Sequence, residues 1–330
     1  MIKRAAVVGL GSIAARHRAN LKILFKDIEI IALSSRGRFI KDKVSDADII
    51  VSDMESLISF SPDFVIIASP STSHVEHALE LLRVNIPLLI EKPVCARNKD
   101  IKVLQHAIKE SKSLVAVGYC LRFLPSAQVV KDLIVNKAIG KIYNVSSSVG
   151  QFLPHWREGV DYHASVSSKK ELGGGVLLEL SHELDYLQWI FGMLEISYSN
   201  IRKSSELEIE VEQIADLILR NKQGVVIYLH QDFIQKKAQR RCSIIGEKGR
   251  IDWDLLSNSV SVHRQDSVEL IYADQLWDKN NMYLNMINNF IGAVENKENL
   301  LCAEIWEAIK IVEMIETIKS NTVWACENDN

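Results

Sequence analysis

Several features are scarce in this sequence, and each scarcity excludes a class of protein. The 330 residues include only five cysteines, at positions 95, 120, 242, 302 and 326, without the close spacing of zinc or redox motifs. Reduced thiols and no bound metal are therefore expected. The formal net charge is only -3, with acidic and basic residues interspersed, which disfavours nucleic acid and anionic membranes as partners. No run of about 18 apolar residues occurs. These absences predict a soluble, cytoplasmic protein.

The first third of the chain has the pattern of a parallel sheet. Overall composition is ordinary, with 47% apolar and 25% charged residues, and the length allows two domains. Up to about residue 120, short apolar runs alternate with helical stretches, which is typical of parallel strands joined by crossover helices. Because several runs are apolar throughout, helices are expected on both faces. The strand-like runs are 5–8, 29–33, 48–51, 64–68, 88–90 and 114–117. We predict an α/β fold with a doubly wound parallel sheet in domain 1–120.

A second domain, 121–330, is predicted from the change of pattern that follows. Glycines 173–175 introduce a helix-like segment that runs to residue 191. Runs at 214–219, 224–230 and 241–245 are interpreted as consecutive antiparallel strands joined by short turns. Helical segments are expected near 126–136, 282–294 and 303–318, with a further strand at 141–149.

A glycine-rich turn follows the first predicted strand and opens the first predicted helix. Gly9 and Gly11 allow the backbone to turn tightly and to approach a pyrophosphate, which the free amides of Ser12 and Ile13 at the helix start would meet. The pattern alone is weak, but its strand and helix context is the required one. We predict a dinucleotide site here; the alternative is a plain strand-to-helix turn.

The end of the second predicted strand bears on the choice of cofactor. NAD enzymes commonly have an acidic residue there for the ribose hydroxyls, whereas this chain has Ser35, Arg36 and Arg38. Arginine forks and hydroxyls suit an adenosine 2′-phosphate. We therefore expect NADP in preference to NAD. The alternative is that the two arginines are solvated loop charges.

One lysine is placed as a catalytic group. Lys92 stands between Glu91 and Pro93 at the carboxyl end of a predicted strand, the edge where doubly wound sheets bind ligands. An ammonium there would stabilise negative charge on a substrate oxygen during hydride transfer. We interpret Lys92 as catalytic, with a surface charge as the alternative.

His182 is the candidate proton-transfer group of the second domain. Glu179 lies three residues before it and Asp185 three after, so one continuous helix would place all three on one side. An imidazole titrates near neutrality and can exchange the proton of a hydroxyl. Asp185 would orient it. The alternative is a histidine hydrogen-bonded in a domain interface.

The segment 151–162 is long for a connection and alternates aromatic with hydrogen-bonding residues, which favours a binding loop. Trp156 and Tyr162 would stack on sugar faces, and Arg157 and Asp161 would bind hydroxyls or an acidic group. Tyr162 would also assist the proton step. A Trp156 that simply packs the loop down is the alternative.

Taken together, these segments resemble the Gfo/Idh/MocA family, the glucose-fructose oxidoreductase and inositol dehydrogenase relatives. The matching segments are the Gly9 turn running into Arg16-His17, Ala68-Ser69-Pro70 with His74, Glu91-Lys92-Pro93, Arg122-Phe123 with Pro125, residues 139–142, and the block from Gly173 to His182 and Asp185. The resemblance adds Ser69, Pro70, His74 and Glu91 to the cofactor-binding set, and Arg122 and Asp185 to the substrate-binding set. Many relatives have an aspartate four residues before the histidine, whereas Glu179 is three before His182, which leaves its role open.

The resemblance implies a Rossmann domain and a C-terminal α/β domain whose large, mostly antiparallel open sheet commonly mediates homodimers or homotetramers. It also implies oxidation or reduction at a carbinol carbon of a sugar, cyclic polyol or nucleotide sugar, with a link to surface-glycan chemistry. Two alternatives stay open: an NAD-dependent glycosidase that oxidises its substrate transiently, and a non-catalytic dinucleotide sensor.

Overall fold

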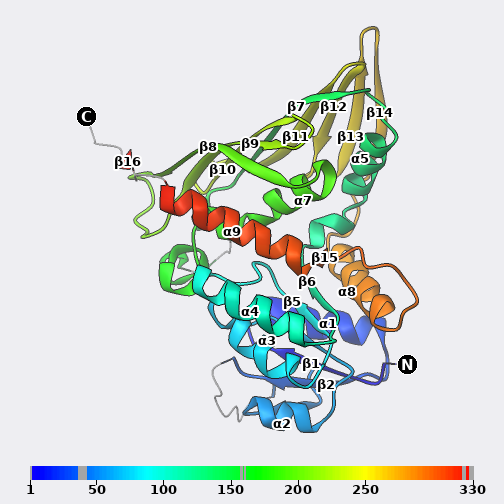
Figure 1. The fold of residues 1–330 in the computed structure, drawn as a ribbon, viewed down its shortest axis with the longest axis vertical. Coiled ribbons are helices and arrows are strands. Elements are labelled where there is room, and N and C mark those ends of the chain that lie inside the picture. The colour runs from blue at the N-terminus through cyan, green and yellow to red at the C-terminus, as the bar shows by residue number, and fades with distance from the viewer. Residues whose placement is uncertain (1, 36–42, 157–158, 160, 322–324, 327–330) are drawn as a thin grey trace. The chain divides into compact units, whose positions relative to one another are not determined.

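The computed structural model describes residues 2–35, 43–156, 159, 161–321 and 325–326. The chain divides into two compact units, the first made of residues 1–120 and 280–313 and the second of residues 121–279 and 314–330. Among the described residues, no helix has the length and apolar character needed to cross a membrane. Figure 1 shows the two units with their elements.

The first unit is built on a seven-stranded sheet in the order β15-β6-β5-β4-β1-β2-β3. Strands β1 to β6 pair in parallel, and β15 joins the edge at β6 antiparallel. The strands are β1 (Arg4–Val8), β2 (Glu29–Leu33), β3 (Ile49–Val51), β4 (Phe64–Ile67), β5 (Leu88–Ile90), β6 (Val115–Val117) and β15 (Ala303–Glu304). Every residue of β4 and β5 is buried, as expected for strands covered on both faces. The predicted doubly wound sheet is confirmed.

The helices of this unit lie beside its sheet, and all but the last stand in the connections between parallel strands (Figure 1). They are α1 (Ser12–Leu24), α2 (Met54–Ser59), α3 (His74–Leu82), α4 (Asn98–Glu110) and α8 (Asn281–Val294). The sequence pattern assigned residues 280–313 to the second domain, but the structure places them in the first unit. The reason lies in tertiary contacts: α8 packs on α1, Phe290 meets Phe64 edge to face, and β15 pairs with β6.

The second unit contains a nine-stranded sheet in the order β14-β13-β12-β11-β7-β10-β9-β8-β16. Most neighbours are antiparallel, which confirms the large, mostly antiparallel sheet. Its strands are β7 (Ile142–Gly150), β8 (Leu194–Lys203), β9 (Ile214–Asn221), β10 (Val226–Asp232), β11 (Gln239–Gly246), β12 (Gly249–Asp254), β13 (Ser259–Arg264), β14 (Ser267–Ala273) and β16 (Ala325–Cys326). The expectation of three consecutive antiparallel strands is wrong in one respect. Strand β7 lies between β10 and β11 and pairs in parallel with β10.

The helices associated with the second unit are α5 (Pro125–Val135), α6 (Val176–Glu179) and α7 (Ser181–Phe191), while α9 (Ile305–Asn321) belongs partly to each unit. Helices α5 and α6 contact strands of the sheet. The sequence predicts one helix after the glycine cluster, but Leu180, with φ -100° and ψ 23°, interrupts it. Glu179 and His182 therefore lie on two short helices rather than on one continuous helical side.

Candidate active site

The glycine turn of the first unit is shaped by its contact with the end of β4. Gly9 has φ +119°, and a Cβ atom there would lie 2.4 Å from the carbonyl oxygen of Ala68. Only glycine fits this position without strain. Gly11 differs, because a Cβ there would meet nothing within 4 Å. The backbone after Gly9 therefore approaches β4 closely while that at Gly11 faces open space.

The start of α1 suits an anionic ligand. Gly11 is its N-cap, without a side-chain cap bond, and the first turn carries no acidic residue. The amides of the first turn and the positive end of the helix dipole are thus available to a pyrophosphate. Ser12 and Ile13 supply the first amides, so the predicted dinucleotide residues fit the group.

Lys92 follows β5 at the same carboxyl edge of the sheet. The preceding Glu91 is 7% exposed, and its carboxylate accepts a hydrogen bond of 2.7 Å from Nε2 of the fully buried His17. Burial alone would raise the pKa of Glu91, but the His17 hydrogen bond and the nearby Lys92 charge lower it. A buried carboxylate is thereby held as an anion beside the lysine.

Three other predicted cofactor residues lie around the end of β4. Ser69 and Pro70 follow the strand, with Ser69 8% exposed. His74, at the start of α3, is 1% exposed, and its Nδ1 and Nε2 lie 3.0 Å and 2.8 Å from the carbonyl oxygens of Pro93 and Ser69. The contacts of His74 are therefore with the backbone of the protein itself. Ser35 follows β2, and Arg36 and Arg38 lie outside the described residues.

In the second unit, the glycine block is fitted around a buried carboxylate. Glu212 is 1% exposed and accepts from Lys319 at 3.0 Å and from the Leu177 amide at 3.4 Å. Gly175 has φ +110°, and a Cβ atom there would lie 2.3 Å from the Glu212 carboxylate. The glycine thus allows Glu212 to meet the start of α6, the helix that carries Glu179.

His182 stands in the first turn of α7 with a side-chain exposure of 18%. Its Nε2 atom lies 3.5 Å from Oε1 of Glu183, a carboxylate with no exposed surface. Arg240, on β11, donates to the same oxygen through Nη2 and, at 2.7 Å, through Nε. An arginine-neutralised carboxylate therefore lies against the imidazole.

Arg122 and Asp185 pair with each other. The guanidinium Nε and Nη2 atoms donate to the two carboxylate oxygens at 3.0 Å and 2.7 Å, and the side chains are 3% and 0% exposed. The sequence interpretation gave both to the substrate and also gave Asp185 to His182. In the structure they form an interior link between the turn Cys120–Phe123 and α7.

Several described residues of the predicted substrate loop make contacts within the second unit. Trp156 donates from Nε1 to the Gln151 carbonyl at 3.1 Å and packs edge to face on Phe233, which agrees with the packing alternative. Asp161 caps the turn that begins at Tyr162, and the ring centroids of Tyr162 and His163 are 3.9 Å apart. Arg157 lies outside the described residues.

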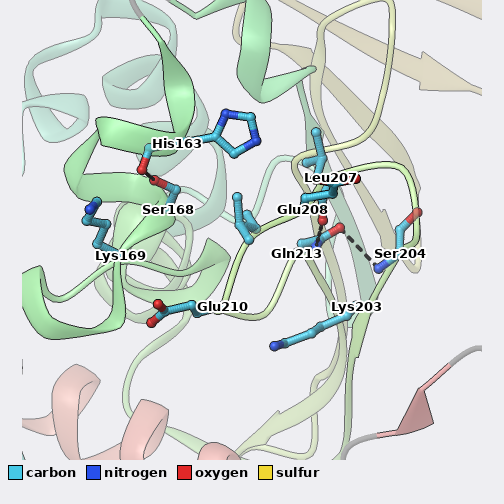
Figure 2. A pocket seen from close by; sticks show the side chains of 10 residues that line it. His163, Ser168, Lys169, Lys203, Ser204, Leu207, Glu208, Glu210 and Gln213 are labelled. Carbon is cyan, nitrogen blue, oxygen red and sulfur yellow. Dashed lines mark hydrogen bonds between the residues drawn. The ribbon is translucent and has the colours of Figure 1, made fainter.

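A cavity of about 310 Å³ adjoins this loop. One wall comes from the segment that follows the loop, through His163, Ser168 and Lys169, and the other from the connection between β8 and β9, including Gln213. Figure 2 shows these side chains, with the Gln213 hydrogen bond to the Ser204 amide. Its lining includes the charged residues Lys169, Lys203, Glu208 and Glu210 and the imidazole of His163. The cavity suits a strongly polar group.

Sequence reasoning missed His17, Glu183 and Arg240. His17 was noted only as part of a motif, and Glu183 is simply the residue after His182. Arg240 lies 57 residues beyond Glu183. The usable signal was the carboxylate of Glu183 directly beside the histidine that the sequence had already singled out.

Comparison with known families agrees with both units. Residues 3–119 match a model described as the oxidoreductase family, NAD-binding Rossmann fold, and residues 127–252 match the GFO/IDH/MocA C-terminal domain. The fold and the glycine turn thus define a class of Rossmann oxidoreductases. The chain belongs to the GFO/IDH/MocA family.

Two curated relatives and one solved structure illustrate the similarity. Oxidoreductase P35 of Formosa agariphila is 25% identical over 217 residues, covering 62% of this chain and 63% of the relative. The D-glucoside 3-dehydrogenase of Escherichia coli K12 is 23% identical over 202 residues, covering 60% and 56%. The matches thus span less than two thirds of either relative. The WlbA dehydrogenase of Bordetella pertussis, solved with NADH and UDP-GlcNAcA, has a TM-score of 0.81 at 20% identity, covering 97% and 96% of the two chains. That likeness concerns the fold.

Proposed function

We propose that this protein is a nicotinamide-dependent dehydrogenase or reductase that acts on a carbinol carbon of a sugar, cyclic polyol or nucleotide sugar. The observation that carries the proposal is the position of Lys92 beside the Glu91 carboxylate, at the sheet edge where the uncapped α1 begins. The names of the relatives, a glucoside dehydrogenase and a dehydrogenase complexed with a nucleotide sugar, support the substrate class.

The bound dinucleotide would supply or accept the hydride. Lys92 would stabilise the negative charge that develops on the substrate oxygen, because its ammonium need not reorganise during the step. His182 would exchange the hydroxyl proton, with the Glu183 carboxylate beside it. Glu179 and Tyr162 would assist that transfer.

We assign NADP as the preferred cofactor and NAD as the alternative. Support comes from Ser35, Arg36 and Arg38 after β2, where an acidic residue would favour NAD. Arg36→Ala should therefore weaken NADPH binding more than NADH binding in a fluorescence titration. Equal effects on both cofactors would contradict the assignment.

The loop that contains Asp161 and Tyr162 is assigned to the substrate. Support comes from the polar cavity beside it, where Lys169 and His163 present cationic or hydrogen-bonding groups. Lys169→Ala should raise KM for the substrate with little change in kcat, since the group is placed to bind rather than to react.

We also assign the protein to the cytoplasm as a homodimer or homotetramer. The cytoplasmic assignment is supported by the described cysteines at 95, 120, 242 and 302, which are thiols, three of them buried.

The assignment as an oligomer is supported by two exposed tyrosines on the sheet of the second unit. Tyr198 and Tyr228 both pair with Ile218 and are 54% and 48% exposed. An exposed row of this kind favours self-association.

The test is a screen of sugars and nucleotide sugars with NADP and NAD, followed by the variant Lys92→Met. This variant keeps the length of the side chain without its charge, so turnover should fall by at least about 100-fold while dinucleotide affinity is largely retained. Lys99→Met, at an exposed lysine on α4, is the matched control.

Three outcomes would contradict the proposal. One is an unchanged rate in Lys92→Met, and another is absence of dinucleotide binding by the parent protein. The third is glycoside cleavage with dinucleotide that survives dialysis, which would identify the transient-oxidation glycosidase.

A further inference from the structure

Two histidines on the first turns of α3 contact the ends of neighbouring strands. His74 and His77 are three residues apart on one helical side, and are 1% and 8% exposed. Both contact Ser69, the second residue after β4. The His74 ring lies 2.8 Å from the Ser69 carbonyl oxygen, and the His77 ring lies 3.0 Å from the Ser69 hydroxyl. Each histidine also contacts one further strand end.

We propose that His74 and His77 form a brace that positions the ends of β2, β4 and β5 for the cofactor and for Lys92. Both are positioning residues, because their ring contacts are with the protein's own backbone and hydroxyl groups. This proposal rests on the proposed function for its consequences in catalysis. The claim that the two histidines hold these loops in place rests on the contacts alone.

His77 connects β4 to the end of β2. Its Nδ1 lies 3.0 Å from the Ser69 hydroxyl, and the Ser35 backbone lies near enough to the ring to oppose the lowering of its pKa by burial. With Nδ1 occupied by the hydroxyl, Nε2 is the nitrogen left for Ser35. A neutral ring protonated on Nε2 satisfies both contacts, since it accepts at one nitrogen and donates at the other. Ser35 is where the adenosine end of the dinucleotide is expected, so His77 bears on cofactor binding.

His74 connects β4 to the loop after β5. Its Nδ1 lies 3.0 Å from the Pro93 carbonyl oxygen, one residue beyond Lys92. A neutral ring has a single N–H group, so it donates either to this carbonyl or to that of Ser69, which lies 2.8 Å from Nε2. The tautomer protonated on Nδ1 donates to Pro93 and fixes the backbone immediately after the proposed catalytic lysine. A displacement of a reacting group by about 1 Å can cost 100-fold in rate, so the bond bears on turnover.

Ser69 is also in contact with the phosphate-binding turn. A Cβ atom on Gly9 would lie 3.0 Å from the Ser69 amide nitrogen, so the two loops touch. The brace therefore holds a segment that supports the glycine turn, in addition to the ends of β2 and β5.

Asparagine and glutamine substitutions separate the bonds of each histidine. An asparagine amide falls near the position of Nδ1 and a glutamine amide near that of Nε2. His77→Asn should lose the Ser35 contact, and His77→Gln should keep it. His74→Gln should lose the Pro93 bond, and His74→Asn should keep it. His106→Asn, at an exposed histidine on α4, is the matched control.

The first measurement is amide hydrogen exchange on the protein without cofactor. His77→Asn should raise exchange in peptides containing Ser35, and His74→Gln in peptides containing Lys92, while the control changes neither. Unchanged exchange in both variants would overturn the brace, whatever the protein catalyses. Dinucleotide binding and turnover are measured next.

His77→Asn should weaken dinucleotide binding about 10-fold with kcat within about twofold, since one hydrogen bond is lost. His74→Gln should lower kcat about 10-fold with dinucleotide Kd within about twofold. His77→Gln should keep the dinucleotide Kd of the parent, and His74→Asn should keep its kcat. A joint loss of Kd and kcat in every variant would indicate a merely structural role and overturn the assignment. Failure of the parent protein to bind dinucleotide would instead contradict the proposed function.

Discussion

The Nε2 atom of His17 lies 2.7 Å from Oε1 of Glu91, and this bond joins the first helix to the residue before Lys92. His17→Leu should destabilise the protein by about 3 to 5 kcal/mol, because it removes the imidazole partner of a buried carboxylate. Urea unfolding at pH 7 measures this cost. The double variant His17→Leu/Glu91→Gln removes the buried charge and should recover part of the stability. A single variant as stable as the parent would show that the pair does not hold these elements together.

The same pair predicts an acid response. Because the folded protein lowers the pKa of Glu91, its contribution to stability is present above the unfolded pKa of about 4.3 and is lost as pH falls through the folded value. Glu91→Gln should reduce this acid sensitivity, as followed by unfolding curves between pH 3 and 6. An unchanged acid dependence in the variant would contradict the assignment of this effect to Glu91.

Two glycines of one turn should respond differently to alanine. Gly9→Ala places a Cβ 2.4 Å from the Ala68 carbonyl oxygen at φ +119°, so folding should be impaired or stability reduced by several kcal/mol. Gly11→Ala occupies open space at φ -72° and should fold normally. If the turn binds a pyrophosphate, Gly11→Ala should still weaken dinucleotide binding. Thermal melts and cofactor titration test the pair, and equal melting temperatures for both variants would contradict the contact at Gly9.

The fold was predictable where the signal was local. The apolar runs at Glu29–Leu33 and Leu88–Ile90 give the bounds of β2 and β5 as the structure has them. The position of β7 between β10 and β11 was not predictable, because period-two patterning marks a strand without naming its partner. The return of residues 280–313 to the first unit has the same cause.

The candidate site divides in a similar way. Gly9 and Lys92 were found because each occupies a defined place at the end of a strand. His17 and His77 were not interpreted, because their partners, Glu91 and Ser35, are remote in sequence. The break at Leu180 was missed because leucine is itself a strong helix former. Tertiary packing decided these features.

The buried pair of Arg122 and Asp185 predicts a structural rather than a substrate phenotype. Arg122→Met should cost about 3 to 5 kcal/mol, since it removes the arginine partner of the buried Asp185 carboxylate. The double variant Arg122→Met/Asp185→Leu, which replaces both charges with apolar groups, should be more stable than the single variant. Chemical denaturation measures both. A single variant of normal stability with a raised substrate KM would restore the substrate-binding interpretation.

The exposed tyrosines of the second sheet provide a test of self-association. Tyr228→Glu places a charge at a side chain that is 48% exposed beside Ile218, so it should shift an assembly through this face towards the monomer. Sedimentation velocity measures the change. Lys222→Glu, at an exposed position in the turn before β10, is the control for a charge change. An unchanged assembly in Tyr228→Glu would place the interface elsewhere.

Histidines in the two units should affect stability with opposite pH dependence. Burial lowers the pKa of His74 and His77, against the raising effects of Glu91 on the first and of Glu76 on the second. The stability that these two histidines contribute is present above the unfolded-state pKa of about 6.5 and is lost as pH falls below it. Hydrogen bonds to Asp232 and Asp216 raise the pKa of His230, so its contribution is present below about 6.5 and is lost as pH rises through the folded value.

Unfolding curves between pH 5 and 8 distinguish the stability contributions of these histidines. His230→Gln should lower stability more at pH 5.5 than at pH 8, because the protonated ring is the form that Asp216 and Asp232 stabilise. His77→Gln should flatten the decline of the parent on the acid side, because it removes a ring that takes up a proton only on unfolding. A His230→Gln effect that grows towards pH 8 would reverse the sign and refute the charge assignment for that site.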